Sequence, residues 1–473
     1  MAAAPAPTTL RELRNSGYPD RSVKEELRAN LLGRLSSGGR LFPGIVGYED
    51  TVVPTLERAL LAGHDIILLG ERGQAKSRLI RHLTELLDDR MPVIEGCEVN
   101  DHPYRPICSR CRTLVAERGD ATPVSWVARD DRFSEKLATP DTSVADLIGD
   151  IDPMKVAAGR HLGDELTIHY GLVPRTNRGI FAINELPDLP ERIQVALLNI
   201  LEERDVQVRG YRIRLPLDMV LIASANPEDY THRGRIITPL KDRFGAQLRT
   251  HYPRRIDEEI EIVEQEAAPP PAGIDVRVPR YLKEVIAGFT FLLRDSPQVN
   301  QRSGVSVRFS IGAYETLVAS ALRRAVRRGE EEVAPRVVDL WAVLPAALGR
   351  VEFDALEEGR EELILERALK QALLEVWTHR LASHDFSTLI ERFDEGLEVE
   401  TSDLTTATDL LAQMGSKRPL SDIEPILKKL EVGDESPSTA AGALEFALEG
   451  LHLRKRLNKT PGDDDGAWIF EAS

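Results

Sequence analysis

The sequence predicts an α/β domain with a parallel sheet, followed by a largely helical region. Between residues 41 and 266, short apolar runs alternate with amphipathic segments, which is typical of a parallel sheet covered by helices. The segment AAPPPAG at 267–273 is a linker, because its three prolines cannot continue a helix. Beyond it, apolar residues recur at helical spacing to residue 457.

The bulk composition excludes several classes of protein. The 473 residues suggest two to four domains, at about 150 residues per domain. No apolar run reaches the roughly 18 residues that a membrane helix needs, and the start lacks a secretory pattern. The net charge of -16 argues against nucleic-acid binding through bulk charge, although a local basic channel would survive it. Three cysteines rule out a disulfide scaffold. We therefore expect a soluble, cytoplasmic protein.

The first two parts of the chain are an N-terminal helical segment and the α/β core. Residues 1–40 contain one predicted helix, 22–35, with leucines at helical spacing and a stop at Gly38-Gly39. The core, 41–266, contains three strand candidates that are nearly all apolar, as strands covered on both faces should be: 66–69, 179–183 and 219–224.

The remainder divides into a helical domain, 274–380, and a helical C-terminal extension, 381–473. We expect the charged segment 385–457 to be helical and the polar end, 460–473, to be flexible. The helices predicted in the first of these domains are 279–293, 311–328, 335–352 and 362–379.

The sharpest motif is IILLGERGQAKSRLIRHL at 66–83, where an apolar strand enters a small loop that opens a helix. Such a loop wraps backbone N–H groups around a phosphate chain, while Lys76 neutralises it and Ser77 offers a hydroxyl to Mg²⁺. Ala75 stands where the G-x-x-x-x-G-K-[ST] pattern has its second glycine, which costs little unless that residue is left-handed. The predicted nucleotide-binding residues of this loop are Gly70, Glu71, Arg72, Gly73, Gln74, Ala75, Lys76 and Ser77.

Two further strands end in polar residues at the edge where open α/β sheets place their chemistry. Glu185, at the end of the strand FAINE, is the candidate general base for the water that attacks ATP. Asn184 stands where such ATPases usually carry an Asp that holds Mg²⁺. Because an amide brings no charge, the sequence leaves open how tightly the site binds the metal and how fast it hydrolyses ATP. Asn226, which follows VLIASA, could orient the same water.

The order of these motifs resembles the AAA+ ATPases, in the branch of the magnesium chelatase I subunit and MoxR-type proteins, over about residues 41–350. By that resemblance, GERGQAKS is the Walker A loop, FAINE is Walker B and Asn226 is sensor 1. The resemblance implies that Arg243 is an arginine finger and that Arg308 is sensor 2, with Arg302 as the runner-up.

The same resemblance implies further parts of the fold and site. The segment FPGIVG at 42–47 is similar to the family's entry segment, so Ile45 and Val46 are expected to flank the adenine. A β-hairpin is expected at 205–218, and a second insertion at 149–179 with its strand pair within 163–179. The implied fold is an AAA+ P-loop core with hairpin insertions and a helical lid.

The function implied is that of an ATP-hydrolysing motor that uses ATP and Mg²⁺ and forms a homo-oligomeric, hexameric ring. It would remodel a client protein or assist metal insertion, with a von Willebrand factor A-like partner. Two alternatives stay open: a true magnesium chelatase subunit of porphyrin metalation, and a slow-hydrolysing nucleotide switch in which Asn184 and Ala75 damp turnover.

The three cysteines fall within one short stretch, GCEVNDHPYRPICSRC. Cys108 and Cys111 form a C-x-x-C pair, and Cys97 with His102 would complete a tetrahedral Cys₃His zinc site. The spacing is not that of a known zinc ribbon, so cysteines without a ligand and a redox role remain as alternatives. A zinc ion here would be structural.

Overall fold

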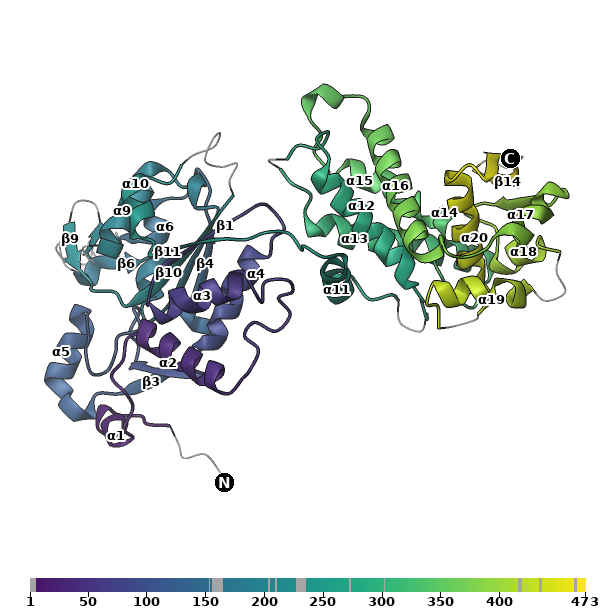
Figure 1. The fold of residues 1–473 in the computed structure, drawn as a ribbon. Coiled ribbons are helices and arrows are strands. Elements are labelled where there is room, and N and C mark those ends of the chain that lie inside the picture. The colour runs from purple at the N-terminus through teal and green to yellow at the C-terminus, as the bar shows by residue number, and fades with distance from the viewer. Residues whose placement is uncertain are drawn as a thin grey trace. The chain divides into compact units, whose positions relative to one another are not determined.

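The computed structural model describes residues 6–152, 154, 165–202, 205–208, 211–226, 235–271, 274–301, 303–415, 419–433, 436–462 and 466–473. The chain forms two compact units, Met1–His251 and Tyr252–Ser473, which are described separately (Figure 1). The finer division into four parts stays a prediction.

The first unit is built on a parallel five-stranded sheet in the order β11-β1-β10-β7-β4. The non-consecutive order follows from helical crossovers, which parallel neighbours require. The predicted core strands are confirmed to within a residue at their C-terminal ends. The bounds are β1 (Ile66–Leu69), β4 (Phe133–Leu137), β7 (Gly179–Asn184), β10 (Met219–Ala225) and β11 (Ala246–Arg249).

Both faces of the three central strands are covered, which is why β1, β7 and β10 are almost entirely apolar. Along β1, Ile66 packs in one hydrophobic core and Ile67 in a second core. Along β7, Ile180 belongs to the first core and Phe181 to the second. Alternate residues of a strand point to opposite faces, so the two cores lie on the two sides of the sheet.

The helices of the first unit surround the sheet. The predicted helix at 22–35 is α2 (Val23–Ser36), which begins at a capping box of Ser22 and Glu25. The others are α1 (Leu10–Asn15), α3 (Val52–Leu61), α4 (Lys76–His82), α5 (Ser109–Arg118), α6 (Val144–Leu147), α8 (Leu172–Arg175), α9 (Glu191–Glu202) and α10 (Thr238–Arg243).

Three antiparallel strand pairs extend from this core. The hairpin expected at 205–218 is present as β8 (Asp205–Val208) and β9 (Tyr211–Arg214). In the second insertion, β6 (Ile168–Tyr170) pairs with β5 (Gly149–Ile151), which precedes the segment 163–179 in which we expected both strands. That detail of the prediction was wrong. The third pair is β2 (Arg90–Ile94) with β3 (Val124–Ala128).

The second unit is mainly helical and has one continuous main core, which joins residues from Tyr281 to Phe470. The expected helix at 335–352 is divided in two, α14 and α15, because the chain turns at Trp341 and Ala342. The helices are α11 (Ile256–Glu266), α12 (Arg280–Asp295), α13 (Val307–Arg328), α14 (Val337–Leu340), α15 (Val343–Leu348), α16 (Glu361–Leu381), α17 (Ser387–Asp394), α18 (Ala407–Ala412), α19 (Pro419–Lys429) and α20 (Pro437–Leu453).

The C-terminal extension also contains a small antiparallel sheet that the sequence did not predict. Its order is β12 (Val399–Thr401), β14 (Trp468–Ala472) and β13 (Leu457–Pro461). Phe470 of β14 is fully buried, so the expectation of a flexible chain end was wrong for these residues. Within the described parts of the chain, no helix is long and apolar enough to cross a membrane.

Candidate nucleotide-binding site

The three predicted strand ends meet at one edge of the sheet. Leu69 of β1 is in register with Ala225 of β10, and Ala223 of β10 with Ile183 of β7. Because all three strands are parallel, the residues that follow them emerge side by side. The sheet therefore brings the loop after β1, Asn226 after β10 and the Asn184-Glu185 pair of β7 to one place.

Lys76 lies at the centre of this group and is buried. Its Nζ donates to the backbone oxygens of Gly70 and Glu71, at 2.6 and 2.7 Å, and to Oδ1 of Asn226 at 2.7 Å. The ammonium is thus held inside the loop by three oxygens. This is where a lysine that contacts phosphate must lie.

Gly70 is required by the closeness of its neighbours. A Cβ added here would lie 1.9 Å from Oγ1 of Thr250 and 2.2 Å from Oε1 of Gln74. That Gln74 oxygen accepts from the Glu71 amide at 3.0 Å and from the Thr250 hydroxyl at 2.7 Å. The loop is therefore fastened to the chain after β11, and the side chain of Gln74 is committed to shaping it.

Ala75 adopts the left-handed conformation, with φ 52° and ψ 18°. This is the case in which the alanine is costly, since a side chain in this region is less favourable than glycine by about 1–2 kcal/mol. The backbone takes the left-handed conformation that glycine favours, although the residue at this position is alanine. Gly73, at φ 75°, takes a left-handed conformation without that cost.

Ser77 and Asn184 face each other, with 3.4 Å between Oγ and Oδ1. Asn184 Oδ1 also accepts from the Ser224 hydroxyl at 3.1 Å, and its Nδ2 donates to Glu135 Oε1. Glu135 lies on β4, the strand beside β7, and accepts from Arg81 Nε at 2.8 Å. The carboxylate that Asn184 lacks is thus present one strand away.

Glu185 and Asn226 form the other half of the site. Nδ2 of Asn226 donates to Oε2 of Glu185 at 2.7 Å, while its Oδ1 accepts from Lys76. Glu185 takes a left-handed conformation, φ 56°, just after β7, and its amide donates to Ser224 Oγ at 3.3 Å. One asparagine therefore links the candidate base to the candidate phosphate lysine.

Comparison with known proteins agrees with this arrangement. The family described as "AAA domain (dynein-related subfamily)" matches residues 123–244, which include Walker B and sensor 1 but not the phosphate loop. The chain is 28% identical over 354 residues to the magnesium-chelatase 38 kDa subunit of Acidiphilium rubrum, covering 69% of this chain and 95% of that protein. By these matches the chain is similar to the AAA+ proteins, and among them to the magnesium-chelatase I subunits.

Two other comparisons are weaker, one in coverage and one in similarity. The 38 kDa subunit of Rhodobacter capsulatus is 28% identical over 47% of this chain, which spans 59% of that protein's length. A solved BchI–BchD complex of magnesium chelatase aligns with TM-score 0.36 and 22% identity, over 70% of this chain and 98% of that one. A score of this size carries no argument about assembly.

The other predicted residues lie around the site in different ways. Glu71 is half-buried and Arg72 is exposed. Ile45 and Val46 are buried, Ile45 within the hydrophobic core. Their neighbour Tyr48 donates to the backbone oxygen of Gln74 at 2.8 Å, so the entry segment directly supports the phosphate loop.

The three candidate arginines lie in different parts of the chain. Arg243 is exposed at the last position of α10, on the surface of the first unit. Arg308 is exposed at the second position of α13, in the second unit, and its backbone oxygen accepts from Arg350 at 2.9 Å. Arg302 lies outside the described residues. Their roles stay predictions.

Sequence reasoning missed Glu135 and Ser224. Neither belongs to a recognisable motif, and Glu135 reaches the site only because β4 pairs with β7. The one available signal for Ser224 was its place two residues before Asn226. A cavity of about 440 Å³ lies elsewhere in the first unit: Asp65, Arg178 and Asp218, which line it, precede the strands at the opposite edge of the sheet.

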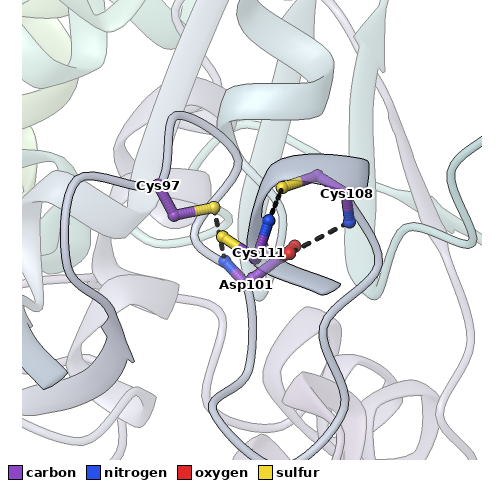
Figure 2. Close-up of side chains that lie close together, drawn as sticks. All are labelled: Cys97, Asp101, Cys108 and Cys111. Carbon is purple, nitrogen blue, oxygen red and sulfur yellow. Dashed lines mark hydrogen bonds between the residues drawn. The ribbon is translucent and has the colours of Figure 1, made fainter. Parts of the chain in front are cut away.

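The cysteine cluster lies at a separate place in the first unit. Ligand atoms of Cys97, Asp101, Cys108 and Cys111 all lie within 4.8 Å of one another (Figure 2). His102 is not part of this group, so the expected Cys₃His set was wrong in its fourth member. The His102 ring instead packs against Tyr18 and Tyr104, and burial lowers the pKa of His102 to about 3.

Electrostatics in this cluster are strongly perturbed. Hydrogen bonds from the thiols of Cys108 and Cys111 lower the pKa of Cys97 to about 4. Burial raises the pKa of Asp101 to about 7. The pKa of Cys111 is raised, chiefly by its hydrogen bonds to the other two sulfurs. Three thiols this close cannot all ionise without a compensating positive charge.

Proposed function

We propose that this chain binds Mg²⁺–ATP and hydrolyses it as the motor subunit of a homo-oligomeric ring. The observation that carries the proposal is the convergence of Lys76, Ser77, Asn184, Glu185 and Asn226 at the carboxyl edge of the sheet. Phosphoryl transfer needs a cradle for the phosphates, a metal ligand and a group that positions water. This edge offers all three.

The residues fit the nucleotide and its metal ion. The ammonium of Lys76 lies within the loop, in contact with the backbone oxygens of Gly70 and Glu71 and with Oδ1 of Asn226, where phosphate oxygens would be strong, charge-assisted partners for it. The Ser77 hydroxyl would hold Mg²⁺, beside Asn184 and with the Glu135 carboxylate behind them. When bound, Mg²⁺ bridges phosphate oxygens and neutralises the charge that develops on them.

Glu185 would then take the proton of the attacking water, with Asn226 orienting that water or the phosphate. In this structure the Glu185 carboxylate is engaged by Asn226, so it would have to turn from that bond to act. Arg243 would approach the phosphates from the neighbouring subunit, and Arg308 from the same chain's second unit. Ile45 and Val46 would border the adenine.

Similarity to known proteins supports a proposal for the process that ATP hydrolysis would drive. Two of them are named as magnesium-chelatase subunits, and one of these is covered over 95% of its length. We propose a cytoplasmic hexameric ring that remodels a client protein or assists metal insertion, together with a von Willebrand factor A-like partner. A subunit of the porphyrin-metalating chelatase itself is the narrower form of this proposal.

A second candidate is a nucleotide-dependent switch with slow turnover. Two observations favour it: the left-handed Ala75 and the neutral Asn184 at the metal position. A neutral amide holds Mg²⁺ less strongly than a carboxylate does. The Glu135 carboxylate favours turnover instead, because it supplies negative charge beside Asn184, at the position where Mg²⁺ would bind.

Phosphate release with ATP and Mg²⁺ separates the two candidates. We expect release that rises more than proportionally with protein concentration and that falls at least about a hundredfold in Glu185→Gln, a loss typical of a missing general base. Lys76→Ala should lose ATP binding as well, measured with a fluorescent nucleotide. Asn184→Asp is the matched variant: it restores the usual carboxylate with almost no change in volume.

The outcomes are distinct. Tight ATP binding without release in the wild type, but with release in Asn184→Asp, would establish the switch. Unchanged ATP affinity in Lys76→Ala would overturn the nucleotide site itself. A normal rate in Glu185→Gln would remove Glu185 from the role of base.

A further inference from the structure

The cysteine cluster is built from three places in one loop region. Cys97 follows β2, Asp101 lies in the loop beyond it, and Cys108 and Cys111 lie at the start of α5, with Cys108 as its N-cap. Figure 2 shows the four side chains converging, and their ligand atoms lie within 4.8 Å of one another. We infer that Cys97, Asp101, Cys108 and Cys111 form a structural Cys₃Asp site for one Zn²⁺ ion.

The spacing fits a single ion. Zn²⁺ binds thiolate sulfur at about 2.3 Å, so sulfurs at the corners of a tetrahedron are about 3.8 Å apart. An iron–sulfur cluster distributes its cysteines over different iron atoms and needs wider spacing than the 4.8 Å seen here. Three soft thiolates with one carboxylate in a tetrahedral set suit zinc, whereas Mg²⁺ and Ca²⁺ prefer oxygen ligands alone.

The carboxylate of Asp101 is already oriented by the backbone. Its Oδ2 accepts from the amides of Ile107 and Cys108, at 3.1 and 3.0 Å. Its Oδ1 is buried and has no hydrogen-bond partner among the residues that the structure describes. A buried carboxylate oxygen without a partner destabilises the folded state, and a metal ion bound to that oxygen would offset the cost.

Backbone amides also point at the sulfurs. The amide of Asp101 donates to Cys97 Sγ at 3.3 Å, and the amide of Cys111 donates to Cys108 Sγ at 3.4 Å. N–H donors of this kind orient and stabilise ligating thiolates, as outer hydrogen bonds do in metal sites. Arg110 Nη1 lies 3.7 Å from Cys111 Sγ and is the one cation in contact with a sulfur among the described residues.

The site is closed, which defines its role. Asp101 and Cys111 are fully buried, Cys108 is nearly so, and Cys108 and Cys111 belong to the second hydrophobic core. Four protein ligands leave no open position for substrate or water, as in structural zinc sites. The ion would fasten the loop from Gly96 to Cys108, and the start of α5, to the end of β2.

Metal analysis of the purified full chain tests the inference, with ZnCl₂ supplied under reducing conditions and excess removed. We expect about one zinc per chain. Substitution of Co²⁺ should give a thiolate-to-cobalt charge-transfer band. Asp101→Asn, which keeps an oxygen for the two amides, should weaken zinc affinity by more than about tenfold, and Cys111→Ser should abolish the cobalt band.

His102→Gln is the matched control, because it changes the neighbouring residue that lies outside the cluster. It should keep the zinc and the cobalt spectrum. Zinc lost from His102→Gln but retained in Asp101→Asn would overturn this ligand set. A wild-type chain that takes up no zinc, holds iron instead, or contains a disulfide between these cysteines would overturn the site. Circular dichroism of each variant separates lost ligands from lost folding.

Discussion

At the residue scale, the phosphate loop shows a conflict between a side chain and its backbone. Ala75 has φ 52°, where glycine is favoured by about 1–2 kcal/mol. Glycine also has more conformational freedom in the unfolded chain, which reduces that gain in stability by about 0.4–1 kcal/mol. Ala75→Gly should therefore stabilise the protein by up to about 1.6 kcal/mol, or leave it unchanged.

Urea unfolding followed by the fluorescence of Trp126 measures this effect, in a background in which Trp341, Trp377 and Trp468 of the second unit are replaced by phenylalanine. Trp126 alone then reports on the first unit. Ala75→Val is the control: a β-branched residue at positive φ is a genuine outlier and should destabilise. Should Ala75→Gly prove clearly less stable than the wild type, the left-handed conformation assigned to Ala75 would be wrong.

Individual residues also show which parts of the sites could be predicted from the sequence and which could not. Lys76, Ser77, Glu185 and Asn226 could be found because each follows its strand directly in the chain. Glu135 could not, since it approaches Asn184 only through the pairing of β4 with β7. Asp101 and His102 are adjacent, and the left-handed turn at Asn100, φ 52°, precedes them. Which of the two faces the sulfurs depends on that turn.

At the element scale, helix α2 is tied to the sheet by a buried ion pair. Arg132, 1% exposed, donates to both carboxylate oxygens of Glu26 at 2.7 Å and to the backbone oxygen of Arg178. Glu26 also accepts from the amide of Asp88. The pair therefore joins four segments that lie far apart in the sequence.

Breaking this pair on one side leaves the other charge buried. Glu26→Ala should destabilise the first unit by about 3–5 kcal/mol, measured by urea unfolding with Trp126 fluorescence. The double variant Glu26→Leu with Arg132→Met removes both charges at similar volume and should lose much less. If the single and double variants were equally destabilised, packing rather than charge would account for the effect.

Elements were predicted well where the pattern is local. The strands at 66–69 and 179–183 and the helix at 22–35 follow from short apolar runs or helical spacing. The sheet of β12, β13 and β14 was missed, because its strands are short and β12 pairs with a segment nearly seventy residues later. Its stabilising contacts, such as buried Phe470, are non-local and leave no periodic signal.

At the scale of the whole molecule, the order of motifs along the chain was sufficient to predict the AAA+ fold. The packing of the second unit was not predictable in the same way. One continuous core joins helices α12 and α16 to the C-terminal helix α20, so the predicted lid and extension share their buried residues. Within this core, Arg336 and Glu445 are both buried, with 3.4 Å between Nε of Arg336 and Oε2 of Glu445. This ion pair links the start of α14 to α20.

The ring itself predicts an effect that no single subunit can show. If Arg243 acts on the ATP of a neighbour, Arg243→Ala keeps a complete ATP site but offers no finger. Lys76→Ala lacks the site but still offers Arg243. Each variant alone should release phosphate at less than about one hundredth of the wild-type rate. Arg243→Ala loses the arginine finger, and Lys76→Ala loses the ATP site. Mixed rings should regain activity, because some interfaces then combine an intact site with an intact finger.

Phosphate release from mixtures at several ratios measures this recovery, with co-assembly verified by co-purification of one tagged variant. The matched control mixes Arg243→Ala with the double variant Lys76→Ala/Arg243→Ala, in which no interface has a finger, and it should stay inactive. Recovery in the first mixture but not in the second can arise only if the arginine acts across the interface. Co-assembled rings of the first mixture that stay inactive would instead place Arg243 in a role within its own subunit.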